Sequence, residues 1–161
     1  MGDMQIISDK VAMSGVLILG ELPDPWILLK VSEDFKRSVF NANRTDEMTY
    51  DDNDAHISVF DEDEVKQVGA GIKELGMSFP FTLRNICQVV PEGWDAMEAA
   101  WFIVVDSPEL EQLRSSYNLT PKMKGDHEFH ITFAVKPKNA VEKSLGVLGL
   151  NQYRWTVKRP Y

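Results

Sequence analysis

Features that would place a protein in a membrane or an oxidising compartment are scarce in this chain. Its 161 residues include one cysteine, Cys87, which can form neither an internal disulfide nor a thiolate zinc site alone. The longest apolar runs, such as residues 16–19, are a handful of residues, whereas a bilayer-spanning helix needs about 20. The N-terminus has no basic signal-peptide start and no myristoylation signal. We therefore expect a cytoplasmic protein with no membrane partner.

Basic charge is also scarce, because 17 Lys and Arg oppose 25 Asp and Glu for a net charge of −8. Binding along a long nucleic acid needs a basic surface, so that class of partner is excluded. Residues 1–120 hold 9 basic and 22 acidic side chains, and residues 121–161 hold 8 and 3. The acid-rich stretch at 45–64 lacks the spacing of an EF-hand and is expected to be solvated surface. The basic C-terminal quarter is suited to a small anionic ligand.

The apolar pattern predicts strands and helices that do not alternate strictly. Composition is ordinary, with 43% apolar and 26% charged residues, which excludes wholesale disorder. Ser32, Asp61 and the Ser107-Pro108 pair are expected to begin helices, the first over 33–42 and the second with apolar residues at helical spacing through Leu75. Residues 1–25 are ambiguous. Strands are predicted at 26–31, 55–60, 81–90, 99–105, 128–135 and 153–158. This mixture favours the α+β class.

A histidine followed by apolar, hydroxyl and apolar residues occurs twice, as His-Ile-Ser-Val at 56–59 and His-Ile-Thr-Phe at 130–133. Side chains on a strand alternate between its faces. His56 therefore shares a face with Ser58, and His130 shares one with Thr132, while the apolar residues between them face the core. Each strand is expected to present an imidazole beside a hydroxyl.

Two such strands facing one another would place the two imidazoles on either side of one phosphodiester. Histidine titrates near 6.5, so one ring can accept a proton while the other donates one. The hydroxyls of Ser58 and Thr132 would hydrogen-bond the nonbridging phosphoryl oxygens. This chemistry needs no metal and no cofactor. The sequence leaves open whether His56 or His130 is the base.

Two of these motifs, 74 residues apart in a small α+β chain, resemble the signature of the 2H phosphoesterase superfamily. The resemblance implies a single domain over residues 1–161, with two pseudo-symmetric lobes, antiparallel sheets around a central cleft and one motif in each lobe. It covers the chain from about residue 26, with residues 1–25 as an N-terminal extension. It also implies that His56 and His130 are the catalytic pair and that Ser58 and Thr132 bind the phosphate.

Superfamily members cleave 2′,3′-cyclic phosphates, ADP-ribose cyclic phosphates, oligonucleotide ends or cyclic oligonucleotide signals, and the motif does not choose among them. The segments at 31–40, 53–58 and 91–94 resemble the small phage 2H enzymes, which include the anti-CBASS phosphodiesterases. That likeness implies a cyclic di- or trinucleotide substrate and a place in the host cytoplasm. The alternatives are a 2′,3′-cyclic phosphodiesterase of RNA processing and a non-catalytic module that sequesters a nucleotide. Linkage, base specificity and oligomeric state stay open.

Further residues are candidates for contacts with a ligand. Trp94 follows a Pro-Glu-Gly turn and could stack on a nucleobase or pack between the lobes. Lys136 has the same parity as His130, so it shares that face and can meet a phosphate if the strand continues regularly. A zinc site is a further alternative, but its spacing matches no usual pattern; it would use His56, Asp126, His127 and His130. A second alternative is a cysteine nucleophile activated by a histidine, although the apolar surroundings of Cys87 favour an inert buried thiol.

Overall fold

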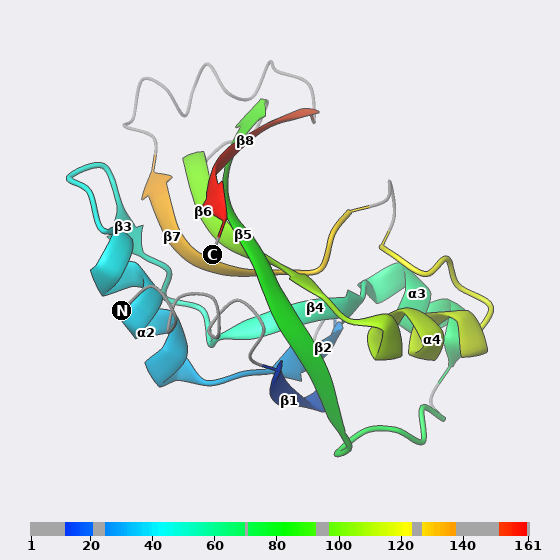
Figure 1. The fold of residues 1–161 in the computed structure, drawn as a ribbon. Coiled ribbons are helices and arrows are strands. Elements are labelled where there is room, and N and C mark those ends of the chain that lie inside the picture. Colours follow the sequence, from blue (N-terminus) through cyan, green and yellow to red (C-terminus); the bar gives the residue numbers. More distant parts are fainter. Residues whose placement is uncertain are drawn as a thin grey trace.

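A computed structural model describes residues 12–20, 25–69, 71–92, 97–123, 127–137 and 152–160, with the backbone alone at 12, 91–92 and 152–160. The elements in chain order are β1 (Ala12–Leu19), β2 (Ile27–Lys30), α2 (Glu33–Asn43), β3 (Thr49–Tyr50), β4 (His56–Phe60), α3 (Glu62–Val68), β5 (Ser78–Glu92), β6 (Met97–Asp106), α4 (Pro108–Ser116), β7 (His130–Pro137) and β8 (Gln152–Pro160). The described strands form one eight-stranded sheet in the order β3-β7-β6-β5-β1-β2-β4, with β8 beside β5 (Figure 1). Neighbouring strands are antiparallel.

The described helices begin where their capping residues predict. The Ser32 hydroxyl accepts from the Phe35 amide at the start of α2. Asp61 and Glu64 form a reciprocal capping box at the start of α3, and Ser107 caps α4 with proline in its first turn. The helical spacing expected through Leu75 is wrong, because α3 ends at Val68 and Gly69 follows with φ 88°. Glycine adopts this left-handed conformation without steric cost, so it ends the helix.

Part of the ambiguous N-terminal region is an inner strand of the sheet. β1 pairs with β2 on one side and with β5 on the other. A Cβ atom at Gly15 would lie 2.5 Å from the Lys30 carbonyl oxygen, so only glycine allows this close approach of β1 and β2. The glycine that interrupts the apolar pattern of this strand is the residue that lets it pair.

The sheet has apolar residues on both faces. The main core joins one face to the helices and contains, among others, Leu17, Leu29, Ile57, Ile103, Leu110 and Ile131. On the opposite face of β5 and β6 lies a smaller set, here called the outer cluster, formed by Cys87, Val89, Ala100, Phe102 and Val104. Trp101 is buried in the main core, whereas Trp26 is 37% exposed and is not a core residue.

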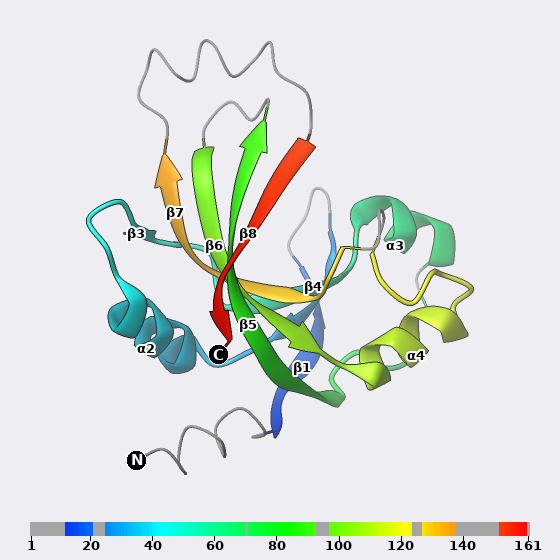
Figure 2. The ribbon, with the colours of Figure 1, turned by 45° about the horizontal axis from the view of Figure 1, so that its top comes forward.

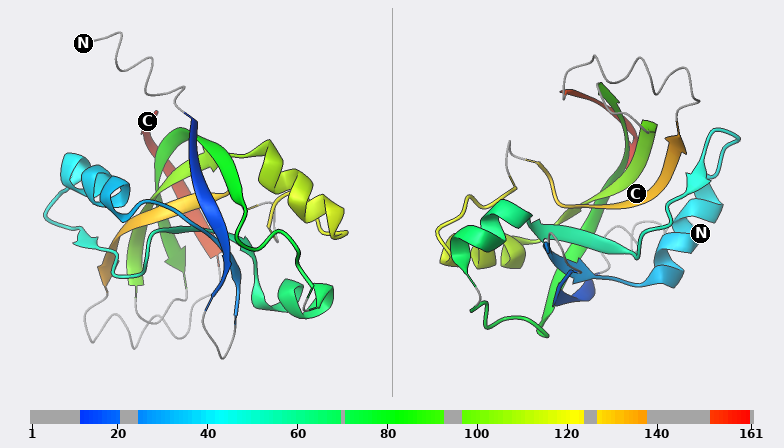
Figure 3. Two further views of the ribbon diagram at one scale, coloured as in Figure 1. Left: turned by 90° about the horizontal axis from the view of Figure 1, so that it is seen from below. Right: turned by 180° about the vertical axis from the view of Figure 1, so that it is seen from behind.

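Curvature of the sheet brings strands from its two ends together. β4, at one end of the strand order, contacts β7, near the other end. α2 packs against β7, and α4 packs against β4 and β5. Figures 2 and 3 show α2 on one side of the strands and α3 with α4 on the other. The α+β class is thus confirmed, while the pseudo-symmetry of two lobes stays a prediction. No described helix is long and apolar enough to span a membrane.

A fully buried guanidinium joins α4 to three other segments. Arg114 makes a bidentate ion pair with Glu64 of α3, at 2.8 and 2.7 Å. It also donates to the carbonyl oxygen of Val59 at the end of β4, at 2.6 Å. In the loop before β7 it donates to the carbonyl oxygens of Thr120 and Lys122, at 2.7 and 3.1 Å. Removing either charge would leave the other buried without its counter-ion.

We expect Glu64→Gln to lower the free energy of unfolding by about 3–5 kcal/mol, the usual cost of removing one partner from a buried ion pair. Lys66→Ala, on the exposed side of the same helix, should change it by less than about 0.5 kcal/mol. Urea unfolding followed by circular dichroism measures both values. Equal stabilities for the two variants would show that the Arg114 ion pair does not hold these segments.

Candidate active site

Both histidine motifs have the alternation of faces that the sequence predicts. On β4, Ile57 and Val59 are fully buried in the main core, and His56 and Ser58 alternate with them and are half-buried. On β7, Ile131 and Phe133 are fully buried, and His130 and Thr132 are half-buried on the other face. Each strand therefore presents an imidazole and a hydroxyl on the face away from the main core.

Contact between β4 and β7 brings the two motifs together. The two histidines also interact electrostatically, because a positive charge on His56 lowers the pKa of His130. Residues that are 74 positions apart in the chain thus share one site. The imidazoles and hydroxyls come from two strands of the sheet.

The two rings are fixed in the same way. His56 Nδ1 lies 2.6 Å from the carbonyl oxygen of Asp54, and His130 Nδ1 lies 2.8 Å from that of Glu128. In each case the carbonyl belongs to the residue two positions earlier. Because a carbonyl oxygen can only accept, each Nδ1 carries a hydrogen. The nitrogen left to exchange a proton with a ligand is therefore Nε2 in both rings.

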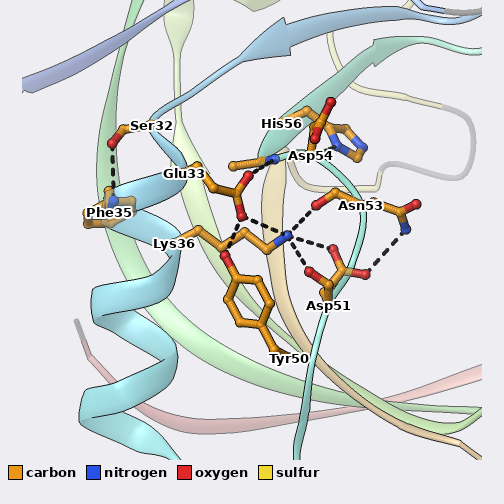
Figure 4. Close-up of polar contacts among 10 residues, drawn as sticks. Ser32, Glu33, Phe35, Lys36, Tyr50, Asp51, Asn53, Asp54 and His56 are labelled. Carbon is orange, nitrogen blue, oxygen red and sulfur yellow. Dashed lines mark hydrogen bonds and ion pairs between the residues drawn. The ribbon is translucent and has the colours of Figure 1, made fainter.

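A buried lysine of α2 holds the segment that precedes His56 (Figure 4). The Lys36 side chain is fully buried, and its ammonium donates to the carbonyl oxygen of Asp51 at 2.6 Å and to its carboxylate at 3.1 Å. It also donates to the carbonyl oxygen of Asn53. One cation thus orders the turn that ends at Asp54, whose carbonyl accepts from His56. Asp51, at 7% exposure, and Glu64, paired with Arg114, are not the solvated carboxylates expected of residues 45–64.

Glu33 adds a second tie between α2 and this segment. One of its carboxylate oxygens accepts from the Ala55 amide at 2.9 Å, and the other accepts from the Tyr50 hydroxyl. Burial and the hydrogen bond to Glu33 raise the pKa of Tyr50 to about 12. Tyr50 therefore stays a donor across the physiological range, and the residue just before His56 is fixed through its backbone.

An ion-pair network holds the residue whose carbonyl binds His130. The Glu128 carboxylate accepts from Lys122 at 2.6 Å and from Arg84, and Arg84 also pairs with Asp106 at 3.1 Å. Burial alone would raise the pKa of Glu128, but the hydrogen bond to Lys122 and the charge of Arg84 lower it. The carboxylate is therefore charged near neutral pH and keeps both cations as partners.

The His130 ring lies beside an aromatic side chain. It stacks obliquely on Phe102 of the outer cluster, with centroids 4.4 Å apart and planes at 38°. Burial lowers the pKa of His130, the hydrogen bond to the Glu128 carbonyl opposes this, and His127 and His56 lower it further. The ring is therefore neutral near pH 7, with Nε2 free to accept a proton.

Lys136 does not share the face of His130, and the prediction that it does is wrong. In the pairing of β7 with β6, Thr132 and Ala134 lie opposite consecutive residues, so Phe133 is an extra residue at a β-bulge. A bulge of one residue reverses the alternation beyond it. Lys136 consequently lies on the main-core face of the sheet. Its ammonium pairs there with two carboxylates, Glu98 at 2.5 Å and Glu47 at 3.2 Å.

The other sequence candidates differ in how far the structure describes them. Trp94 lies outside the described residues, so its contact with a nucleobase stays a prediction. Cys87 is buried in the outer cluster, and burial raises the pKa of its thiol, which disfavours the thiolate that a nucleophile needs. Among the described residues no three His, Cys, Asp or Glu side chains gather as metal ligands do. Asp126 lies outside them.

Sequence patterns did not identify three residues that lie beside the site. Lys36 has a detectable signal, since it lies one turn before Val39 and Phe40 on the buried side of α2. Phe102 and Lys30 have no such signal, because they are brought beside the histidines by the pairing of strands. Lys30 lies opposite His56 in the pairing of β2 with β4.

The family whose description is Swiss Army Knife, 2H phosphoesterase domain, matches residues 27–141, more than two thirds of the chain. The matched range begins with β2 and ends after β7, so it includes both histidine motifs. No curated protein and no solved structure matches the chain.

We expect the pKa of His130, measured by NMR from its ring protons, to lie below the ordinary value of 6.5. Phe102→Ala should raise it toward that value, because water then reaches the ring. Val89→Ala, also in the outer cluster but on β5, is the control and should leave it unchanged. A value of 6.5 or higher in the wild type, or no response to Phe102→Ala, would contradict the role of burial.

Proposed function

Because the chain belongs to the 2H phosphoesterase domain family, we propose that it hydrolyses a phosphodiester bond held between His56 and His130, and that cyclic oligonucleotides are its substrates. One observation carries the proposal. Two imidazoles from adjoining strands each have Nδ1 held by the carbonyl of the residue two positions earlier. This leaves two Nε2 atoms for proton transfer at a single site.

In the proposed reaction His130 is the general base and His56 the general acid. The lowered pKa of His130 favours the neutral ring that can take a proton from water. The water oxygen forms a bond to phosphorus while an ester P–O bond breaks. Protonated His56 donates its Nε2 proton to the departing oxygen. His130 then releases one proton to solvent and His56 takes one up, which restores both rings.

The Ser58 and Thr132 hydroxyls have the complementary task. Each lies two residues after its histidine and on the same face of its strand. In this proposal they donate hydrogen bonds to the nonbridging phosphoryl oxygens, where negative charge grows in the transition state. Since the hydroxyls and imidazoles come from the same two strands, phosphate and proton-transfer groups are positioned together.

The choice of a cyclic oligonucleotide is supported by charge and by the resemblance to small phage enzymes of this superfamily. The chain carries a net charge of −8, which disfavours a long polyanion. A cyclic di- or trinucleotide presents its phosphates in a compact shape that a local site can bind. This substrate class is consistent with the removal of a nucleotide signal of bacterial immunity.

We expect His56→Ala and His130→Ala each to lower the rate of hydrolysis by about 10²–10⁴-fold, the usual contribution of a general acid or base. Ser58→Ala and Thr132→Ala should lower it less. The assay is chromatographic separation of products from cyclic dinucleotides, cyclic trinucleotides and 2′,3′-cyclic mononucleotides, with EDTA present. His127→Ala is the matched control and should stay active.

Each outcome of this screen has a distinct meaning. Turnover of only the 2′,3′-cyclic mononucleotides would indicate a function in RNA end processing. Binding without turnover would make it a sequestering module. Near-full activity in either histidine variant would overturn the two-histidine mechanism, and loss of activity with chelator that zinc restores would indicate metal catalysis.

The pH dependence of kcat/KM is expected to be bell-shaped. Activity requires neutral His130, so the acid limb should lie below pH 6.5, because the pKa of this ring is lowered. Phe102→Ala, which exposes the ring, should shift that limb to higher pH. The pH profiles of wild type and variant at constant ionic strength measure the shift, and an acid limb above pH 6.5 in the wild type would assign the base to another group.

A further inference from the structure

A lysine stands directly beside one of the two histidines. Lys30, the last residue of β2, is the cross-strand partner of His56 in the antiparallel pairing of β2 with β4. Directly opposed residues of such a pair point to the same face, with Cβ atoms about 4.5–5.5 Å apart. The Lys30 side chain is exposed. An ammonium group on a flexible stem is therefore available at the edge of the site.

Lys30 forms no ion pair within the described part of the chain, unlike Arg84 and Lys136, the other cations whose side chains are described on the strands. Arg84, Lys122 and Lys136 form partly exposed ion pairs, and Lys36 and Arg114 form buried ones. No described carboxylate forms an ion pair with Lys30, including Asp52 and Asp54 in the segment before His56. In a chain of net charge −8, an unpaired cation beside the reactive groups is a group available for an anionic ligand.

The strand order places this cation beyond the scissile phosphate. Along the curved sheet, β7 is followed by β4 and then by β2. Lys30 therefore lies on the far side of His56 from His130, one strand away from the space between the imidazoles. On the opposite side of Lys30 the sheet continues with Val16, which is apolar and 39% exposed. The position suits a part of the substrate that adjoins the scissile group.

We propose that Lys30 forms a second phosphate subsite, so that the preferred substrate carries another phosphate next to the one cleaved. This rests on the proposed function and narrows it to substrates with at least two phosphates, such as cyclic dinucleotides. A lysine ammonium is a compact charge that binds phosphate oxygens by charge-assisted hydrogen bonds. The hydroxyls of Ser58 and Thr132 are left for the scissile phosphate.

The test compares Lys30→Met with wild type on a cyclic dinucleotide, which has two phosphates, and on a 2′,3′-cyclic mononucleotide, which has one. We expect KM for the dinucleotide to rise about 10–100-fold, as for the loss of a hydrogen bond to a charged group, with kcat changed less than about threefold. kcat/KM for the mononucleotide should not change. Lys30→Arg should recover most of the dinucleotide affinity, and Lys66→Met, an exposed lysine of α3, is the matched control.

Equal losses on both substrates would place Lys30 on the scissile phosphate and overturn the second subsite, and so would no loss on either. A binding titration separates this proposal from the proposed function. The cyclic dinucleotide is titrated by calorimetry into proteins that carry His56→Ala and His130→Ala, with and without Lys30→Met. If neither substrate is hydrolysed by the wild type, the proposed function fails. An affinity at least tenfold weaker with Lys30→Met would still support the subsite, while equal affinities or no binding would overturn it.

Discussion

Two peptide carbonyls, those of Asp54 and Glu128, determine what the histidines of this protein can do. Each accepts a hydrogen bond from the Nδ1 of the histidine two residues later, which fixes both the tautomer and the rotation of the ring. A free imidazole would sample both tautomers and several orientations, and proton transfer requires one of each. The orientation of both rings therefore depends on how firmly the backbone at residues 54 and 128 is held.

The fold holds these two carbonyls in different ways. Before His56, one fully buried ammonium, that of Lys36, binds the backbone of the preceding turn from α2. Before His130, partly exposed cations bind the side chain of Glu128, and the neighbouring Phe129 is buried in the main core. Salt screens exposed pairs more than buried ones. The position of His56 thus depends on the core, and that of His130 depends in addition on surface charge.

Local patterns predicted the elements that local physics decides. Alternation on the two motif strands and the capping of α2 by Ser32 follow from neighbouring residues, and both are confirmed. The face of Lys136 was not predictable, because a bulge at Phe133 arises from pairing with β6 and reverses the alternation. The burial of Lys36 depends on a turn 15 residues away, and the position of Lys30 opposite His56 depends on strand register. Such contacts require the tertiary structure.

The acidic residues of the chain have two physical roles, which a count of charges does not distinguish. Asp51 and Glu33 are bound by Lys36, Tyr50 and the backbone before His56, so part of the negative charge builds the site. Other carboxylates, such as those of Asp52 and Asp54, are exposed and repel polyanions. At physiological ionic strength, charges more than about 8 Å apart in water are largely screened. A compact ligand bound beside Lys30 would therefore experience mainly that local cation, whereas an extended polyanion would also meet the acidic surface. The small anionic substrate that we propose therefore requires one local cation and not a basic protein.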